Sequence, residues 1–389
     1  MRPVVSVAVG RSVNGEGDWQ NFERLSCCLS SQLNIKPRVL TIDPLSIDWH
    51  SPLAPDHFRS GCAPIEALAF ARELIRSGAE GAVVIRGRDY LKSEYTSVAR
   101  RQAMAIYGES IPLTEAYDQL AHQFMAIQGL SGNEFCQLRD ALYDNYCRTY
   151  TAVENRTHDL PGARWLEPVT ELFRGVDCAN PVVDFDGAML LTSVSLARDL
   201  GVGSGDCVEV CGVGLGLLSG GGPEMVPTIA RYEHLQAAFA SLDQQLEASL
   251  PSLFKRDDLL LELYTCYPVV PMAALLNSGL VSGVDDLLAF IQQTPVTQTG
   301  GMNLARGAWN NPALNGLITM HETLLQHGLR QDASASRPSG TRRHSQEATL
   351  RHASQAAGKE AAASQYGLVH GNGGLGNRQG VALLSPCRY

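Results

Sequence analysis

Residues 60–87 read SGCAPIEALAFARELIRSGAEGAVVIRG, the most informative stretch of the chain. Apolar residues at helical spacing follow Pro64, which suits the first turn of a helix, and Gly78 is placed to end that helix. The apolar run 82–85 then has the length of a buried strand. The stretch predicts a loop, a helix and a strand, with Cys62 directly before the helix.

Strands and helices alternate on both sides of this stretch. The expected strands are 4–9, 188–192, 207–218 and 259–264, and the expected helices are 19–33, 234–250 and 269–279. Asp184 and Asp186 are expected to hold the turn before the strand at 188. Such alternation predicts a layered α/β fold, which we divide into an N-terminal half, 1–200, and a C-terminal half, 201–389.

Two segments depart from the alternation. Residues 93–176 are helical but irregular in pattern, interrupted by prolines, and predict an excursion that covers one side of a sheet. Residues 331–365 are rich in Ala, Ser, Arg and Gln and have almost no large apolar side chains. We expect them to form a flexible, low-complexity insertion whose basic character is open to contact with an acidic partner.

Composition excludes several classes of protein. The 389 residues are 44% hydrophobic and 18% charged, with a net charge of −9 that argues against nucleic acid as a partner. The sequence shows no run of about 18 apolar residues and no signal peptide, so we expect a cytoplasmic protein without a membrane span. The ten scattered cysteines predict neither a disulfide framework nor a metal site. The glycine-rich run 212–222 lacks a dinucleotide or P-loop motif.

Four motifs in the same chain order resemble the thiolase superfamily. They are the stretch 60–87, NPVVDFDGAMLLTS at 180–193, TGGMNLARGAWNNPALNG at 299–316 and HGNGGLG at 370–376. The resemblance is strongest to the divergent, acetyl-CoA acetyltransferase-like branch. It implies a five-layered αβαβα fold made of two similar halves, usually dimeric. It also implies an acyltransferase of lipid metabolism that forms or cleaves a carbon–carbon bond, with an acyl-CoA or carrier-bound thioester as substrate and no separate cofactor.

The resemblance also implies a set of site residues. Cys62 takes the place of the nucleophile, and a helix N-terminus favours the thiolate, although a free cysteine is also commonly a small buried hydrophobe. His370 takes the place of a catalytic acid/base, with an imidazole suited to proton transfer near pH 7. The expected substrate-binding or oxyanion residues are Asn372, Gly373, Gly374, Asn310, Asn311, Tyr264 and Cys266.

The sequence departs from the superfamily pattern at three motifs, one of which is Cys-Ala-Ser-Gly, replaced here by residues 62–65, CAPI. The histidine of the Gly-His-Pro motif is replaced by Ala308, and the Asn-Glu-Ala-Phe segment is replaced by residues 264–267, YTCY. These losses leave a second hypothesis open: a catalytically degenerate subunit that binds acyl thioesters or scaffolds a partner. Some thiolase-like proteins work with a small OB-fold subunit, for which the insertion at 331–365 is a possible contact.

Overall fold

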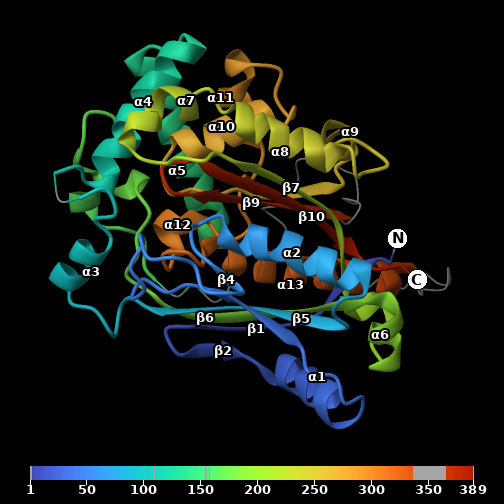
Figure 1. Cartoon of the computed structure of the whole chain (residues 1–389). Coiled ribbons are helices and arrows are strands. Elements are labelled where there is room, and N and C mark those ends of the chain that lie inside the picture. The colour runs from blue at the N-terminus through green and yellow to red at the C-terminus, as the bar shows by residue number, and fades with distance from the viewer. Residues whose placement is uncertain (1, 109, 154–155, 157, 336–364, 389) are drawn as a thin grey trace, which may run out of the picture.

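The computed structural model describes residues 2–108, 110–153, 156, 158–335 and 365–388, without the side chains of 328–335 (Figure 1). Of the expected insertion, residues 331–335 continue a helix and 336–364 lie outside the described residues.

Ten strands in these ranges are joined by hydrogen bonds in the order β4-β3-β5-β6-β1-β7-β10-β9-β8, with β2 paired to β1. Their bounds are β1 (Val4–Val13), β2 (Glu16–Asp18), β3 (Arg38–Ile42), β4 (His57–Phe58), β5 (Ala82–Tyr90), β6 (Asp184–Ser193), β7 (Val208–Leu217), β8 (Leu259–Glu262), β9 (Tyr366–Gly373) and β10 (Arg378–Pro386).

Helices account for most of the remaining ordered chain. The α-helices are α1 (Gln20–Ser31), α2 (Ala63–Ser77), α3 (Ser97–Ala103), α4 (Leu113–Gln128), α5 (Gly132–Ala152), α6 (Val194–Asp199), α7 (Val226–Ile229), α8 (Glu233–Asp243), α9 (Leu250–Lys255), α10 (Val269–Asn277), α11 (Val284–Gln293), α12 (Gly301–Leu304) and α13 (Pro312–Ala335). The 3-10 turns are η1 (Ala163–Leu166), η2 (Gly175–Asp177), η3 (Ser204–Asp206) and η4 (Pro223–Met225).

The sheet folds back on itself where β1 meets β7. At this junction only Val5 and Ser6 of β1 pair with β7. In Figure 1, β1, β5 and β6 lie in a lower layer and β7, β9 and β10 in an upper one, with α2 and α13 between them. Helix α1 lies below the lower layer, and α8 and α10 lie above the upper one. The molecule therefore has the five αβαβα layers that the sequence predicts.

Strand alternation sorts the apolar side chains between these layers. On β5, Val83 and Ile85 join the large core that surrounds α2, whereas Ala82 and Val84 join a smaller core beneath the lower layer with Phe22 of α1. Both faces of the lower sheet are covered, so its strands read as continuous apolar runs rather than as alternating ones.

Residues 60–87 fold as predicted, into a loop, a helix and a strand. Helix α2 begins directly after Cys62 and ends at Gly78, which has the left-handed φ of 80° that favours glycine. Several boundaries differ from the prediction; among them, β6 begins at Asp184, four residues earlier than expected. Asp184 and Asp186 lie in the strand, where Asp184 accepts hydrogen bonds from two backbone N–H groups and Asp186 pairs with Arg86.

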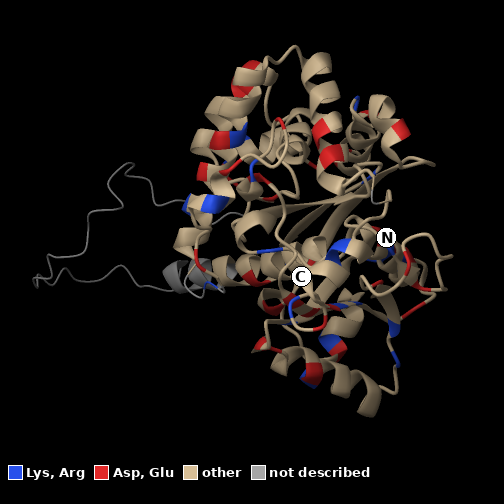
Figure 2. Cartoon of the chain, turned by 90° about the vertical axis from the view of Figure 1, so that its left-hand side faces the viewer, with Lys and Arg blue, Asp and Glu red and all other residues tan. Residues whose placement is uncertain are grey.

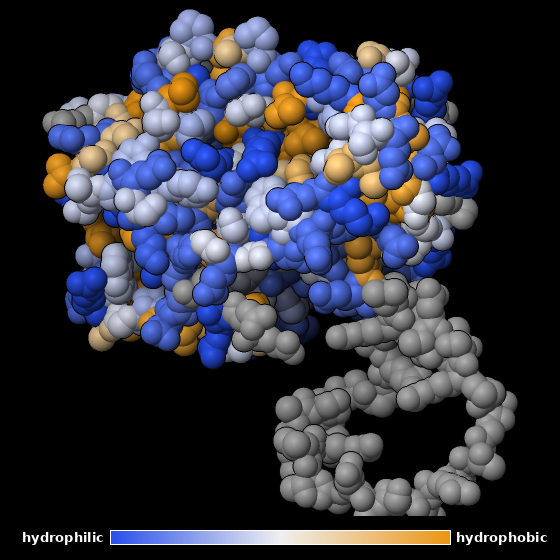
Figure 3. Space-filling model, turned by 90° about the horizontal axis from the view of Figure 1, so that it is seen from below, coloured by the Kyte–Doolittle hydropathy of each residue, from blue (hydrophilic) through white to orange (hydrophobic). Residues whose placement is uncertain are grey.

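The irregular segment 93–176 contains α3, α4 and α5. No helix in the described ranges is long and apolar enough to cross a bilayer. The face seen from below is mostly hydrophilic, and hydrophobic residues show there in groups interrupted by hydrophilic ones (Figure 3).

Candidate active site

A cavity of about 1400 Å³ lies where the excursion 93–176 meets the ends of the strands and helices of the upper layer. Its wall comes from α3, the segment 158–182 and the segment 302–310, and it exceeds the roughly 300–1,000 Å³ typical of pockets for small ligands. Its floor is formed by Gly61, Tyr264, Cys266, Asn372 and Gly374. Segments far apart in the sequence thus meet at this one point.

A chain of hydrogen bonds runs along the floor. The amide Nε2 of Gln379 donates to Asn372 Oδ1 at 2.7 Å and to the Gly376 carbonyl at 2.9 Å. Gln379 Oε1 is therefore an acceptor, and His370 Nε2 donates to it at 2.8 Å. Asn372 Nδ2 in turn donates to the Tyr117 hydroxyl at 2.8 Å. The chain fixes which way the Asn372 amide points.

Cys266 receives the other contact of that amide. Asn372 Nδ2 lies 3.7 Å from Cys266 Sγ, and the backbone N–H groups of Cys266 and Tyr267 also donate toward the sulfur. The nearby Tyr117 hydroxyl donates its own proton to the Gly374 carbonyl at 2.8 Å. Burial raises the pKa of the Cys266 thiol to about 12, although each of the donors to the sulfur lowers it. The sulfur is thus protonated at neutral pH but surrounded by groups that stabilise a thiolate.

Cys62 stands at the N-cap of α2 as predicted, but its thiol does not line the cavity; Gly61 does. A Cβ placed on Gly380 of β10 would lie 2.8 Å from Cys62 Sγ, so the sulfur points at that glycine. Burial and then the charge of Glu66 raise the pKa of Cys62 well above its ordinary value. Glu66 lies in the first turn of α2 and offsets the helix N-terminus.

Cys62 and His370 face opposite sides of the upper sheet. Gly371 and Gly373 of β9 are turned toward Cys62 and Ser60, and side chains alternate along a strand. His370 therefore points away from α2, where it contacts Gln379. The sequence predicts that Cys62 and His370 meet, but the structure does not bring them together.

His370 itself is buried. Burial lowers the pKa of His370 to about 4, so the imidazole is neutral at pH 7. Its Nε2 bears the proton that Gln379 accepts, and its Nδ1 has no partner among the described residues. The ring is suited to holding Gln379 in place rather than to donating a proton to the cavity.

The remaining predicted residues divide between the cavity and its surroundings. Tyr264, Asn372, Gly374 and Asn310 line the cavity together with Cys266. Gly373 and Asn311 do not. Asn311 is fully buried, and its Oδ1 lies against Gly87 of β5, where a Cβ would come within 1.8 Å of it.

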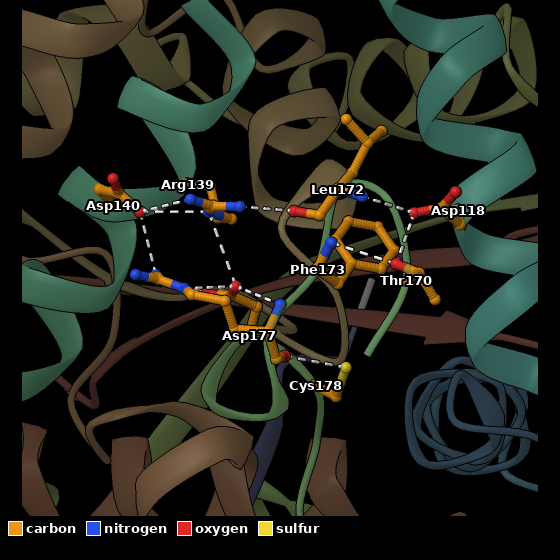
Figure 4. Close-up of polar contacts among 9 residues, drawn as sticks. Asp118, Arg139, Asp140, Thr170, Leu172, Phe173, Asp177 and Cys178 are labelled. Carbon is orange, nitrogen blue, oxygen red and sulfur yellow. Dashed lines mark hydrogen bonds and ion pairs between the residues drawn. The ribbon is translucent and has the colours of Figure 1, made fainter. Parts of the chain in front are cut away.

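Two aspartates, Asp118 and Asp177, stabilise the part of the cavity wall that contains Cys178 (Figure 4). Asp118 of α4 accepts hydrogen bonds from Thr170 Oγ1 at 2.6 Å and from the Leu172 N–H at 3.0 Å. Buried Asp177 pairs with Arg174 at 2.9 Å. Arg139 of α5 donates to the Leu172 carbonyl at 2.7 Å. These contacts hold the segment 170–178 against α4 and α5.

Among the described residues, four arginines line the cavity against a single aspartate, Asp159; they are Arg100, Arg101, Arg164 and Arg306. None of the four forms an ion pair with a carboxylate among the described residues. Elsewhere acidic residues are spread over many surface helices (Figure 2), in keeping with the net charge of −9. The basic lining is therefore a local feature that favours an anionic ligand.

Sequence reasoning missed Tyr117, Gln379 and the arginines. Tyr117 and three of the arginines come from the irregular excursion, where no local pattern marks them. The sequence contained a signal for Gln379, because this polar residue stands beside the apolar run 381–384. The structure buries its side chain fully. A polar residue in that position predicts a specific partner, which is the pair His370 and Asn372.

Comparisons with known proteins agree with the architecture. No family model matches the sequence, and no curated protein sequence matches it. A monomeric SCP2-thiolase-like protein type 1 from Mycobacterium smegmatis superposes with a TM-score of 0.65 at 17% identity, over 99% of this chain and 78% of that one. The Ltp2-ChsH2(DUF35) aldolase superposes with a TM-score of 0.63 at 13% identity, over 100% and 98%. The chain therefore has a divergent thiolase-like fold.

Proposed function

We propose that the cavity binds an acyl thioester on a phosphorylated carrier such as CoA and that Cys266 takes up the acyl group. The observation that carries this proposal is the position of the Cys266 thiol. It lines the cavity and is surrounded by hydrogen-bond donors. Cys178 also lines the cavity, but its thiol donates to the Arg174 carbonyl. Cys62 is turned away.

The proposed step is a thioester exchange. Cys266 Sγ attacks the acyl carbonyl, the bond from that carbon to the carrier sulfur breaks, and the proton of the Cys266 thiol passes to the departing carrier sulfur. Asn372 and the backbone N–H groups of Cys266 and Tyr267 stabilise the sulfur while it is negatively charged. The thiolase-like fold supports a second step, in which the α-carbon of another thioester attacks the acyl carbon to form a carbon–carbon bond. The bond from that carbon to Cys266 Sγ breaks, and the α-proton of the attacking thioester passes to the Cys266 sulfur; the reverse step cleaves the carbon–carbon bond.

In this proposal the arginines bind the phosphorylated carrier. Arg101 and Arg164 are exposed, and guanidinium groups pair well with phosphate oxygens. Trp165 lies beside Arg164 at the cavity and offers an aromatic face for a nucleotide base. These groups suit the phosphorylated end of the carrier, which leaves the acyl end for the floor at Cys266.

In this proposal His370 is a positioning residue. It acts through Gln379 to orient Asn372 and does not touch the substrate. We expect His370→Gln, which keeps a polar side chain, to lower acyl transfer less than His370→Leu, and neither variant to shift the pH profile. A profile that shifts would instead make His370 the acid/base that the sequence predicts.

Intact-protein mass spectrometry after incubation with acetyl-CoA and longer acyl-CoAs tests the proposal. We expect an adduct on the native chain, none on Cys266→Ala, and a normal adduct on the matched control Cys62→Ala. Loss of the adduct in Cys62→Ala with retention in Cys266→Ala would contradict the assignment and restore Cys62 as nucleophile.

A second candidate function is a binding subunit without acyl transfer. It is favoured by the raised pKa of both thiols and by Ala308 in place of the superfamily histidine. The structurally similar Ltp2-ChsH2(DUF35) aldolase is named for two components. We therefore include a partner subunit in this alternative. Three tryptophans line the cavity, Trp49, Trp165 and Trp309. Quenching of their fluorescence by acyl-CoA without any adduct would support this alternative.

A further inference from the structure

We infer that Cys207 and Cys387 are a disulfide-forming pair, which on oxidation joins the C-terminal strand β10 covalently to β7. Cys207 directly precedes β7 and Cys387 directly follows β10. Neither is in a disulfide in this structure, and neither lines the cavity. The inference is independent of the proposed function because it involves no substrate.

The strand register places the two residues opposite each other. Strands β7 and β10 are antiparallel, and their last pair is Pro386 with Val208. One step further out the pair is Cys387 with Cys207, and the Cys387 N–H donates to the Cys207 carbonyl at 3.0 Å. Directly opposed antiparallel residues have Cα atoms roughly 4.5–5.5 Å apart. That span falls within the roughly 4.4–6.8 Å that a disulfide requires.

The side chains also meet. The Cys387 thiol is hydrogen-bonded to the Cys207 sulfur, and the Cys207 thiol in turn donates to the Gly203 carbonyl at 3.6 Å. Both residues are buried in the same region. The sulfurs are therefore neighbours already, and bond formation needs no change of strand register.

The chemistry is a two-electron oxidation. With hydrogen peroxide, one thiolate is oxidised to a sulfenic acid with release of hydroxide, and the second thiol displaces water from the sulfenic acid to form the S–S bond. The hydrogen bond to Cys207 and burial raise the pKa of Cys387, so the thiolate is scarce at pH 7 and the reaction is faster at higher pH. A thiol reductant reverses it.

The bond would have a structural consequence. Residues 207 and 387 are 180 positions apart, so the cross-link restricts a long loop in the unfolded chain. Strand β10 lies between β7 and β9 and contains Gln379, which orients Asn372. Oxidation would therefore stabilise the sheet under the candidate site. We expect the melting temperature to rise by about 5 °C.

Peptide mapping of the full chain tests the inference. The protein is incubated overnight at pH 8.5 with hydrogen peroxide, then denatured, alkylated and digested with trypsin. We expect peptides 199–231 and 379–388 to be linked in the native chain and in the control Cys211→Ser, because Cys211 shares a peptide with Cys207. We expect no linkage and no rise in melting temperature in Cys387→Ser.

The exposed Cys27 shows whether the oxidant has acted. Full alkylation of Cys387 in a sample whose Cys27 is oxidised would overturn the inference, as would a link through Cys211. Reduction with dithiothreitol should restore the original melting temperature.

Discussion

Cys62 and Cys266 both stand just before a helix, yet only one of them meets the cavity. Cys62 precedes α2 and packs against the glycine face of β9 and β10, formed by Gly371, Gly373 and Gly380. Cys266 lies on the opposite side, where Asn372 and Gln379 form a polar face. A helix start is therefore not enough to bring a thiol to the cavity. What matters is the strand face that the thiol meets.

The glycine face exists because α2 packs on it closely. Gly380→Val should lower the free energy of unfolding by about 3 kcal/mol, since its Cβ would lie 2.8 Å from both Cys62 Sγ and Ile65 Cγ2. Urea denaturation measures this, with Gly132→Val as a control because nothing lies near that glycine. Adding Cys62→Ala should recover part of the loss, since the sulfur is one of the two clashing groups. No recovery would place the Cys62 sulfur elsewhere.

The polar face predicts an alkaline rise in reactivity. Because the pKa of Cys266 is raised to about 12, its thiolate fraction grows tenfold with each pH unit between 7 and 9. The rate of acyl labelling should follow, about a hundredfold over those two units. Mass spectrometry of samples quenched at successive times gives the labelling rate at each pH. A plateau below pH 8 would mean that another group activates the thiol.

Asn372 joins the hydrogen-bond chain to Cys266. Asn372→Ala should cost about 2 kcal/mol of stability, because it removes the acceptor of one of the two buried N–H groups of the Gln379 amide. It should also slow labelling more than tenfold, since the donor at Cys266 is lost. Thermal denaturation and the labelling rate measure the two effects. Equal labelling rates in Asn372→Ala and native protein would remove the polar face from the mechanism.

The arginines should have the smallest effect because each is one of four. Arg101→Ala should raise the acyl-CoA concentration for half-maximal tryptophan quenching about fivefold, and added salt should shrink the difference. The exposed Arg24 of α1 lies outside the cavity lining and provides the control Arg24→Ala. An unchanged response to acyl-CoA in Arg101→Ala would take this guanidinium out of the binding site.

Much of the fold follows from local patterns. The helix after Cys62, its end at Gly78 and the strand after it are set by Pro, Gly and apolar spacing, which act within a few residues. The side of the sheet on which each thiol lies depends on strand parity and on long-range packing. The sequence did contain a signal, since glycines at 371 and 373 mark the face where a helix packs closely.

The cavity was harder to predict for a different reason. Tyr117 comes from the excursion 93–176 and reaches Asn372 across more than 250 residues of sequence. No spacing rule relates two such positions. Cys266 was predicted as a binding residue within a motif that had lost its usual amino acids. Its contact with the Asn372 amide becomes visible only when β9 is packed against the segment that precedes α10.

Peptide mapping of the acyl group tests the central claim most directly. The native chain is incubated with acyl-CoA and digested with trypsin, which separates Cys62 in peptide 60–72 from Cys266 in peptide 257–306. The account predicts the acyl group on Cys266. An acyl group on Cys62 would contradict it, because the thiol on the glycine face would then be the one that reaches substrate.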